Sequence, residues 1–107
     1  MTILLNIRHI VLLKFNSAGT PTVISEITAA FAKLRDSIEG VIAFESGENN
    51  SSEGLHRGYT HAFVLTFVDA ESRDRYLPHP HHQAFVALLK PFLDDVLVID
   101  YALLNHN

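Results

Sequence analysis

Three histidines and a tyrosine gather in one short stretch of the chain, Tyr76-Leu-Pro-His-Pro-His-His82. Imidazole has the unperturbed side-chain pKa closest to neutral pH, so a cluster of imidazoles can transfer protons or bind a metal ion. The two prolines cannot lie inside a helix, because each lacks an N–H and its ring clashes with the preceding turn. A helix arriving from Asp69 must therefore end near Leu77, and a new helix can begin at Pro80. The stretch predicts a rigid corner between two helices, and we expect a functional site there.

The three histidines of this corner differ in the chemistry that their positions favour. His82 falls in the first turn of the second helix, where the helix dipole favours a neutral imidazole that can act as a general base. His79 and His81 suit solvated or helix-capping positions. The three histidines are spaced i, i+2, i+3, and no cysteine or carboxylate neighbours them in the sequence. Zinc sites usually have ligands at more regular spacings than this. No phosphate-binding glycine loop or dinucleotide fingerprint occurs either, so we predict no metal ion and no cofactor.

The composition is that of one small folded domain covering residues 1–107. Of these 107 residues, 48% are hydrophobic and 19% are charged, which excludes a disordered chain. The formal net charge of −4, without a run of Lys or Arg, argues against binding to nucleic acid. The apolar segment 1–13 is far shorter than the roughly 20 apolar residues of a membrane span, so we expect no membrane association. The absence of cysteine fits a reducing compartment, and we predict the cytoplasm.

The elements that must position these side chains alternate between strands and helices. Apolar and β-branched residues indicate strands over 7–15, 41–47, 59–67 and 96–104. Residues 21–38 repeat apolar side chains at helical spacing, between a capping Thr20 and a terminating Gly40. Shorter helices flank the histidine corner. This order predicts an α+β, ferredoxin-like fold, in which a four-stranded antiparallel sheet carries its helices on one face.

Two further histidines come together in that topology, because the first and third strands are central neighbours. His9 and His61 each lie on the bulky face of their strand, beneath the corner. Each alone could be a buried structural histidine; as a pair they are candidates for lining a functional cleft.

The opposite face of the predicted sheet is also apolar, with Ile10, Leu12 and Val64 on it. Helices can cover only one face, so this second face would be a contiguous exposed patch, which soluble monomers rarely carry. A second copy of the sheet could bury it as a two-fold dimer. We therefore predict a homodimer through the open sheet face.

Three segments also resemble a known family. They are Arg8-His-Ile-Val-Leu-Leu-Lys-Phe15, Glu53-Gly-Leu-His-Arg-Gly-Tyr-Thr-His61, and the corner itself followed by Ile99-Asp-Tyr101. Together they resemble the stress-responsive dimeric α/β-barrel (Dabb) family over most of the chain. The resemblance implies a ferredoxin-like chain that dimerises sheet to sheet into a shared barrel.

The resemblance further implies site residues, because the polyketide cyclases of this family line their pocket with two strand histidines, a tyrosine and a corner histidine. By motif, the catalytic candidates here are His82, Tyr76, His9 and His61. His82 would act as general base or acid on a hydrophobic carbonyl compound, and Tyr76 would hold the developing oxyanion. The expected apolar lining is Leu13, Phe63 and Phe85. Two alternatives stay open: a non-catalytic binder of a small apolar ligand, and a structural stress-response protein.

Overall fold

The computed structural model describes residues 4–104 of the chain. The elements follow the order β1 (Ile7–Phe15), α1 (Pro21–Ser37), β2 (Val41–Glu48), β3 (His61–Phe67), α2 (Ala70–Tyr76), α3 (Pro80–Leu89), a short 3-10 turn η1 (Lys90–Phe92) and β4 (Leu93–Ala102).

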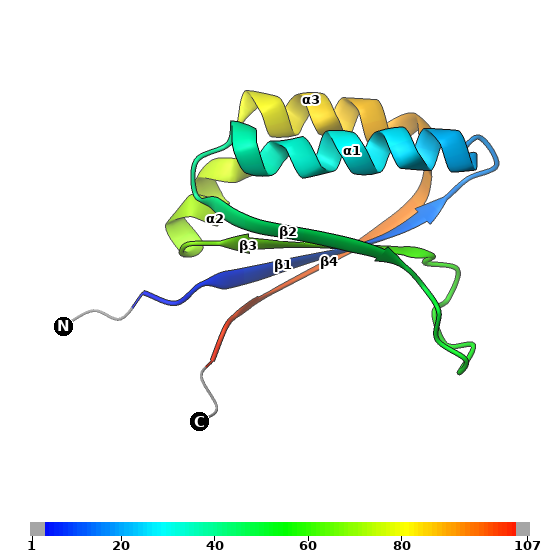
Figure 1. Ribbon diagram of the computed structural model, residues 1–107, viewed down its shortest axis with the longest axis horizontal. Coiled ribbons are helices and arrows are strands. Elements are labelled where there is room, and N and C mark those ends of the chain that lie inside the picture. Colours follow the sequence, from blue (N-terminus) through cyan, green and yellow to red (C-terminus); the bar gives the residue numbers. More distant parts are fainter. Residues whose placement is uncertain (1–3, 105–107) are drawn as a thin grey trace.

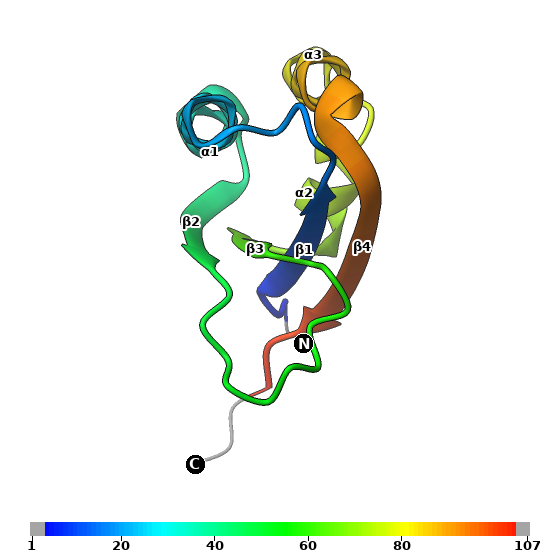
Figure 2. The ribbon, with the colours of Figure 1, turned by 90° about the vertical axis from the view of Figure 1, so that its right-hand side faces the viewer.

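The four strands form one antiparallel sheet in the order β2-β3-β1-β4, with β1 and β3 at the centre. Helices α1 and α3 lie side by side over one face of the sheet, and α2 lies beside one end of it (Figure 1). The end-on view shows the opposite face without a helix (Figure 2). This arrangement confirms the predicted ferredoxin-like fold. Within residues 4–104, no helix is long and apolar enough to cross a membrane.

Local sequence signals set the bounds of α1. The hydroxyl of Thr20 accepts a hydrogen bond from the Val23 N–H at 3.3 Å, and Pro21 occupies the first turn. Gly40 follows the helix with a φ of +96°, a conformation that disfavours residues with a side chain. A Cβ at this position would also lie 2.6 Å from the Cβ of Ser72 in α2. Glycine is therefore required both by the backbone turn and by the close approach of α2.

The predicted corner between α2 and α3 is confirmed. The carboxylate of Asp69 caps α2 by accepting the Ser72 N–H at 2.8 Å. The helix ends at Tyr76, and α3 begins at Pro80. The imidazole Nδ1 of His79 caps α3 by accepting the His81 N–H at 3.1 Å, which is the capping role expected of it.

Three strands differ in their bounds from the sequence prediction, and β2 does so by one residue, because it ends at Glu48 rather than Gly47. β3 begins at His61 rather than Tyr59, because Tyr59 is held in a turn by a backbone hydrogen bond to His56. β4 runs over Leu93–Ala102 rather than 96–104, because its pairing with β1 extends to Phe15 opposite Leu93. The earlier start of β4 shortens the connection from α3 to the three-residue turn η1.

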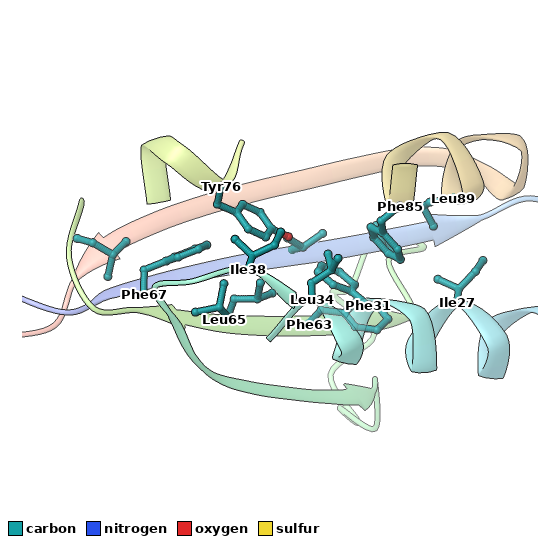
Figure 3. Close-up of a cluster of buried hydrophobic side chains, with 14 residues drawn as sticks. Ile27, Phe31, Leu34, Ile38, Phe63, Leu65, Phe67, Tyr76, Phe85 and Leu89 are labelled. Carbon is teal, nitrogen blue, oxygen red and sulfur yellow. The ribbon is translucent and has the colours of Figure 1, made fainter. Parts of the chain in front are cut away.

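The core lies between the sheet and the helices, on the bulky face that the alternation predicted. Phe31 of α1 is at its centre, with ring centroids 5.0 Å from Phe63 and 4.4 Å from Phe85 (Figure 3). Burial of each such side chain contributes roughly 1.5–3 kcal/mol to folding before entropy is counted. The buried strand residues on this face include Val11, Leu13, Phe63, Leu65 and Phe67.

Candidate functional site

A pocket of about 370 Å³ lies between α3 and the strands β1 and β4. Val98 pairs with Val11, so both side chains face the helices, yet Val98 is 49% exposed because the space above it is unfilled. The polar side chains of the lining are His9, Tyr76, His82 and Lys90. The apolar lining is Val11, Phe31, Leu77, Phe85, Val86, Leu89, Leu93, Val96 and Val98.

His9 is fixed at the pocket wall by a charged chain of side chains. Its Nδ1 lies 2.6 Å from Oδ1 of Asp100, the residue paired with it on β4. The second oxygen of Asp100 accepts a hydrogen bond from Arg73 of α2 at 3.1 Å. A carboxylate only accepts hydrogen bonds, so Nδ1 of His9 must carry the proton. A neutral His9 ring therefore has Nε2 as its acceptor.

Tyr76 extends from the end of α2 over the sheet into the core (Figure 3). The side chain is wholly buried, and its hydroxyl has no hydrogen-bond partner among residues 4–104. Burial raises the pKa of Tyr76 well above its usual value, so the hydroxyl keeps its proton and is a donor. Tyr76 is one of the residues that line the pocket, and its hydroxyl is a buried donor without a partner in the described part of the chain.

His82 contacts Tyr76 from the first turn of α3, with ring centroids 4.3 Å apart and the two ring planes at 40°. Its Nδ1 lies 2.9 Å from the carbonyl oxygen of Leu77, which can only accept, so Nδ1–H is the donor. Burial lowers the pKa of His82 below its usual value of 6.5. At neutral pH the ring is therefore uncharged, and its Nε2 is available as a base.

This fold and sequence identify the family. The model of the stress-responsive A/B barrel domain, Dabb, matches residues 7–103. The chain belongs to this family. It is similar to the stress-response A/B barrel domain-containing protein HS1 of Arabidopsis thaliana, with 40% identity over 89% of this chain and 87% of the relative. It is also similar to olivetolic acid cyclase of Cannabis sativa, with 26% identity over 89% and 94% of the two chains.

Solved structures agree with the Dabb assignment. The crystal structure of At3g17210 from Arabidopsis thaliana matches with a TM-score of 0.90 and 38% identity, covering 94% of this chain and 98% of that one. A dimeric ferredoxin-like protein of unknown function from Jannaschia matches with a TM-score of 0.79 and 29% identity over 90% and 97%. A hydroxynitrile lyase from Passiflora edulis shares the fold alone, with a TM-score of 0.88 and 20% identity over 98% and 99%.

The Dabb domain brings together only part of the expected site. His9, Tyr76, His82 and Phe85 line the pocket described above. His61 instead lines a separate hollow of about 380 Å³ under the start of α1, together with Phe63. Phe31 and Phe85 line the first pocket and Phe63 lines the second, and the Phe31 ring contacts both of the other rings. Leu13 is fully buried in the core between the sheet and the helices and lines neither of them.

Two residues of the Dabb site were missed from the sequence, Asp100 and Arg73. Asp100 interrupts the otherwise apolar segment 96–104, which was a signal, but its pairing with His9 depends on the register of β4. Arg73 lies in a charged helix segment with several similar residues, and nothing in the sequence distinguishes it. Within residues 4–104, no three His, Asp or Glu side chains come close enough to hold a metal ion.

Proposed function

We propose that this Dabb domain is a small enzyme of lyase or cyclase type, transferring protons on a hydrophobic carbonyl compound. The observation that carries the proposal is the close contact between the His82 and Tyr76 rings at the wall of an apolar pocket. One ring supplies a neutral nitrogen base, and the other supplies a protonated hydroxyl without a partner in residues 4–104. These are the two groups that enolisation of a carbonyl compound requires.

In the proposed reaction, Nε2 of His82 takes the proton from the carbon next to the substrate carbonyl. The electron pair of that C–H bond moves toward the carbonyl oxygen, which becomes an oxyanion. The Tyr76 hydroxyl donates a hydrogen bond to this oxygen, where charge develops in the transition state. The enolate carbon then attacks an acceptor or takes back a proton, and His82 returns the proton that it removed.

The lining of the pocket supports a mainly apolar substrate. Nine of its side chains carry no charge and no hydrogen-bonding side-chain group, and they would bury an alkyl or aryl portion of a ligand. The buried, unpaired Tyr76 hydroxyl would be satisfied by a ligand oxygen, which removes a penalty of about 1–3 kcal/mol. The name of one relative, olivetolic acid cyclase, supports a cyclase-type reaction.

Deuterium exchange tests the proposal without knowledge of the natural substrate. The probe is a medium-chain methyl ketone in D₂O, and NMR follows the loss of its α-proton signals. We expect the protein to accelerate exchange above the buffer rate. Exchange at the buffer rate, with the ketone shifting resonances of pocket residues, would contradict catalysis and support the alternative of a binder of small apolar ligands, which the apolar lining favours.

We also propose that the chain forms a homodimer through the open sheet face. Leu97, Ile99 and Tyr101 of β4 are large and exposed there, beside the central residues of β1. A second copy would cover these apolar side chains. Relatives described as dimeric ferredoxin-like proteins support this assembly.

A cytoplasmic location stays a prediction from the sequence.

A charged residue on the open face tests the dimer. Ile99 is 55% exposed in the single chain, so Ile99→Glu should fold as a monomer but fail to dimerise, because an unpaired carboxylate would be buried at the interface. Leu88→Glu is the matched control, since Leu88 is 49% exposed on α3, away from this face. Sedimentation at micromolar concentration should show dimers for wild type and Leu88→Glu. A wild-type monomer would contradict the proposal.

A further inference from the structure

We propose that Lys90 binds a carboxylate at the far end of the pocket, so that the substrate is an amphipathic keto acid rather than a wholly apolar ketone. The assignment of the carbonyl end to His82 and Tyr76 rests on the proposed function. The binding of an anionic end by Lys90 can be measured without turnover, so it can be tested separately.

The part of α3 that lines the pocket is a single stripe with a different polar residue at each end. With its C-terminal cap, the helix contributes residues at the i, i+3, i+4, i+7 and i+8 spacing of one face. These residues are His82, Phe85, Val86, Leu89 and Lys90. At the rise of an α-helix, the eight positions from His82 to Lys90 cover roughly 12 Å. The imidazole and the lysine therefore belong to opposite ends of the pocket, with only apolar side chains of α3 between them.

The sheet side of the pocket repeats this arrangement. His9 and its partner Asp100 lie at the end beneath the α2–α3 corner. The four positions from Asp100 back to Val96 cover roughly 13 Å at the rise of an antiparallel strand. The β4 residues that line the pocket, Leu93, Val96 and Val98, are all apolar. Helix and strand thus give the pocket nearly the same length, which fits an extended ligand with one functional group at each end.

The turn η1 fixes the backbone from which Lys90 extends. The N–H of Asn16, just after β1, donates to the Phe92 carbonyl at 2.9 Å, and the Asn16 side-chain amide donates to the Pro91 carbonyl at 3.0 Å. Pro91 also restricts the backbone directly after Lys90. Lys90 itself is exposed to solvent. Binding of a ligand therefore requires ordering of this side chain but not of the chain that carries it.

The charges around this end of the pocket favour an anion. Among residues 4–104, Lys90 is the only lysine, arginine, aspartate or glutamate in the lining, and it takes part in no ion pair. Asp94 and Asp95 follow it in the sequence, but neither lines the pocket, and Asp95 accepts the Tyr59 hydroxyl at 2.5 Å. Asp100 lies at the opposite end. The far end of a ligand therefore meets one cation and no carboxylate of the lining.

A single lysine at a helix C-terminus suits a singly charged group. The carbonyls that end α3 carry a partial negative charge of about half a unit. They stabilise the Lys90 ammonium but oppose a second negative charge beside it. A carboxylate carries one charge, whereas a phosphate group carries about −1.5 to −2 at neutral pH. The pocket therefore favours a carboxylate over a phosphate.

Two probes of equal length test the inference by NMR titration. One is methyl octyl ketone, and the other is the keto acid in which a carboxylate replaces the terminal methyl group of the octyl chain. Lys90→Met should weaken binding of the acid by roughly two- to fivefold, the contribution of a solvent-exposed ion pair, and should not weaken binding of the ketone. Lys90→Glu should weaken binding of the acid further, because the two carboxylates repel each other.

Lys33→Met is the matched control. Lys33 is an exposed lysine of α1 that does not line this pocket, so its replacement changes the net charge equally but should leave both affinities at the wild-type value. Salt gives a second readout. Raising the salt concentration should weaken wild-type binding of the acid but not of the ketone, because salt screens an exposed ion pair.

Two results would overturn the inference. Equal losses for acid and ketone in Lys90→Met would show that the lysine acts through its aliphatic chain rather than its charge. An acid affinity that is the same in Lys90→Met and Lys33→Met would show that the position of Lys90 does not matter.

The outcomes also separate this inference from the proposed enzyme activity. A selective loss for the acid, together with α-proton exchange at the buffer rate, would support the inference and contradict the proposed activity. Where exchange is accelerated, Lys90→Met should raise KM for the acid and leave kcat unchanged, because substrate and transition state lose the same contact. Wild-type protein that binds neither probe would contradict both proposals.

Discussion

His9 and His61 occupy comparable positions, one on each central strand and both on the helix-facing side of the sheet. Around His9 the fold assembles Asp100 from β4 and Tyr76 from α2, and the tyrosine ring in turn contacts His82 of α3. Around His61 the close partners are the adjacent Thr60 hydroxyl at 2.8 Å and the Phe15 ring of β1 at a centroid distance of 5.3 Å. Within residues 4–104, only His9 of the two therefore forms a hydrogen bond with a side chain from another element, whereas the His61 hollow takes its polar lining from α1 and β2.

The difference arises from what covers each end. The α2–α3 corner lies over the His9 end and brings a hydroxyl and an imidazole to the pocket. The His61 end faces the first turns of α1, where Pro21, Ile24, Ser25 and Thr28 line the hollow. The Thr28 hydroxyl already donates to the Ile24 carbonyl, so it is not free to bind a ligand as a donor. His9 and His61 share one face of the sheet but line separate hollows, because different elements cover the two ends of that face.

The largest expected effect is a loss of exchange rate when a histidine of the pocket, but not the histidine of the other hollow, is replaced. His82→Ala should lower the rate of ketone α-proton exchange by roughly two to four orders of magnitude, the usual contribution of general acid–base catalysis. His61→Ala should leave most of the rate, because His61 lies in the other hollow. Circular dichroism of both variants would confirm that each is folded. Equal losses in the two variants would show that the two regions act as one site.

The fold could be predicted from the sequence because the signals for strands and helix ends are local and recur along the chain. Alternation in β1 and β3 identified the buried face, and Thr20, Gly40, Asp69 and Pro80 marked helix ends by backbone chemistry that depends on few neighbours. The histidine corner was predictable for the same reason, because two prolines restrict the backbone wherever they occur.

The composition of the site was less predictable because it depends on contacts between distant segments. His9 and Asp100 are 91 residues apart and meet only through the register of β1 and β4. The separation of His61 from His9 depends on three phenylalanine rings whose contacts cannot be read from spacing. The uncharged state of His82 was expected from the helix dipole, whereas burial is the main cause of its lowered pKa.

Tyr76 offers an intermediate effect, in which stability and activity should change in opposite directions. Tyr76→Phe removes a buried hydroxyl that has no partner within residues 4–104, so it should raise the free energy of unfolding by about 1–3 kcal/mol. It should also lower the exchange rate, by less than His82→Ala does, because the oxyanion loses a donor.

Tyr59→Phe is the matched control for this variant. The Tyr59 hydroxyl donates to Asp95 at 2.5 Å, so its removal breaks an existing hydrogen bond and should not stabilise the protein. Thermal unfolding of both variants distinguishes them, since 1 kcal/mol corresponds to a shift of about 4–8 °C in a domain of this size. A lower unfolding temperature for Tyr76→Phe would indicate that its hydroxyl is already satisfied in the free protein.

The smallest expected effect is the pH dependence that His82 gives to stability. Burial lowers the pKa of His82 in the folded state below 6.5, so the unfolded chain binds a proton more readily than the folded one. Stability is therefore unaffected by this group above pH 6.5 and falls as the pH decreases from 6.5 through the lower pKa of the folded state.

Thermal unfolding at pH 7.5 and pH 5.5 should show a smaller difference in His82→Gln than in the wild type. His56→Gln, which replaces an exposed histidine of the β2–β3 loop, should keep the wild-type difference. If His82→Gln also keeps the wild-type difference in stability, the His82 ring titrates alike in the folded and unfolded chains. His82 would then not be the buried neutral base that distinguishes the pocket from the His61 hollow.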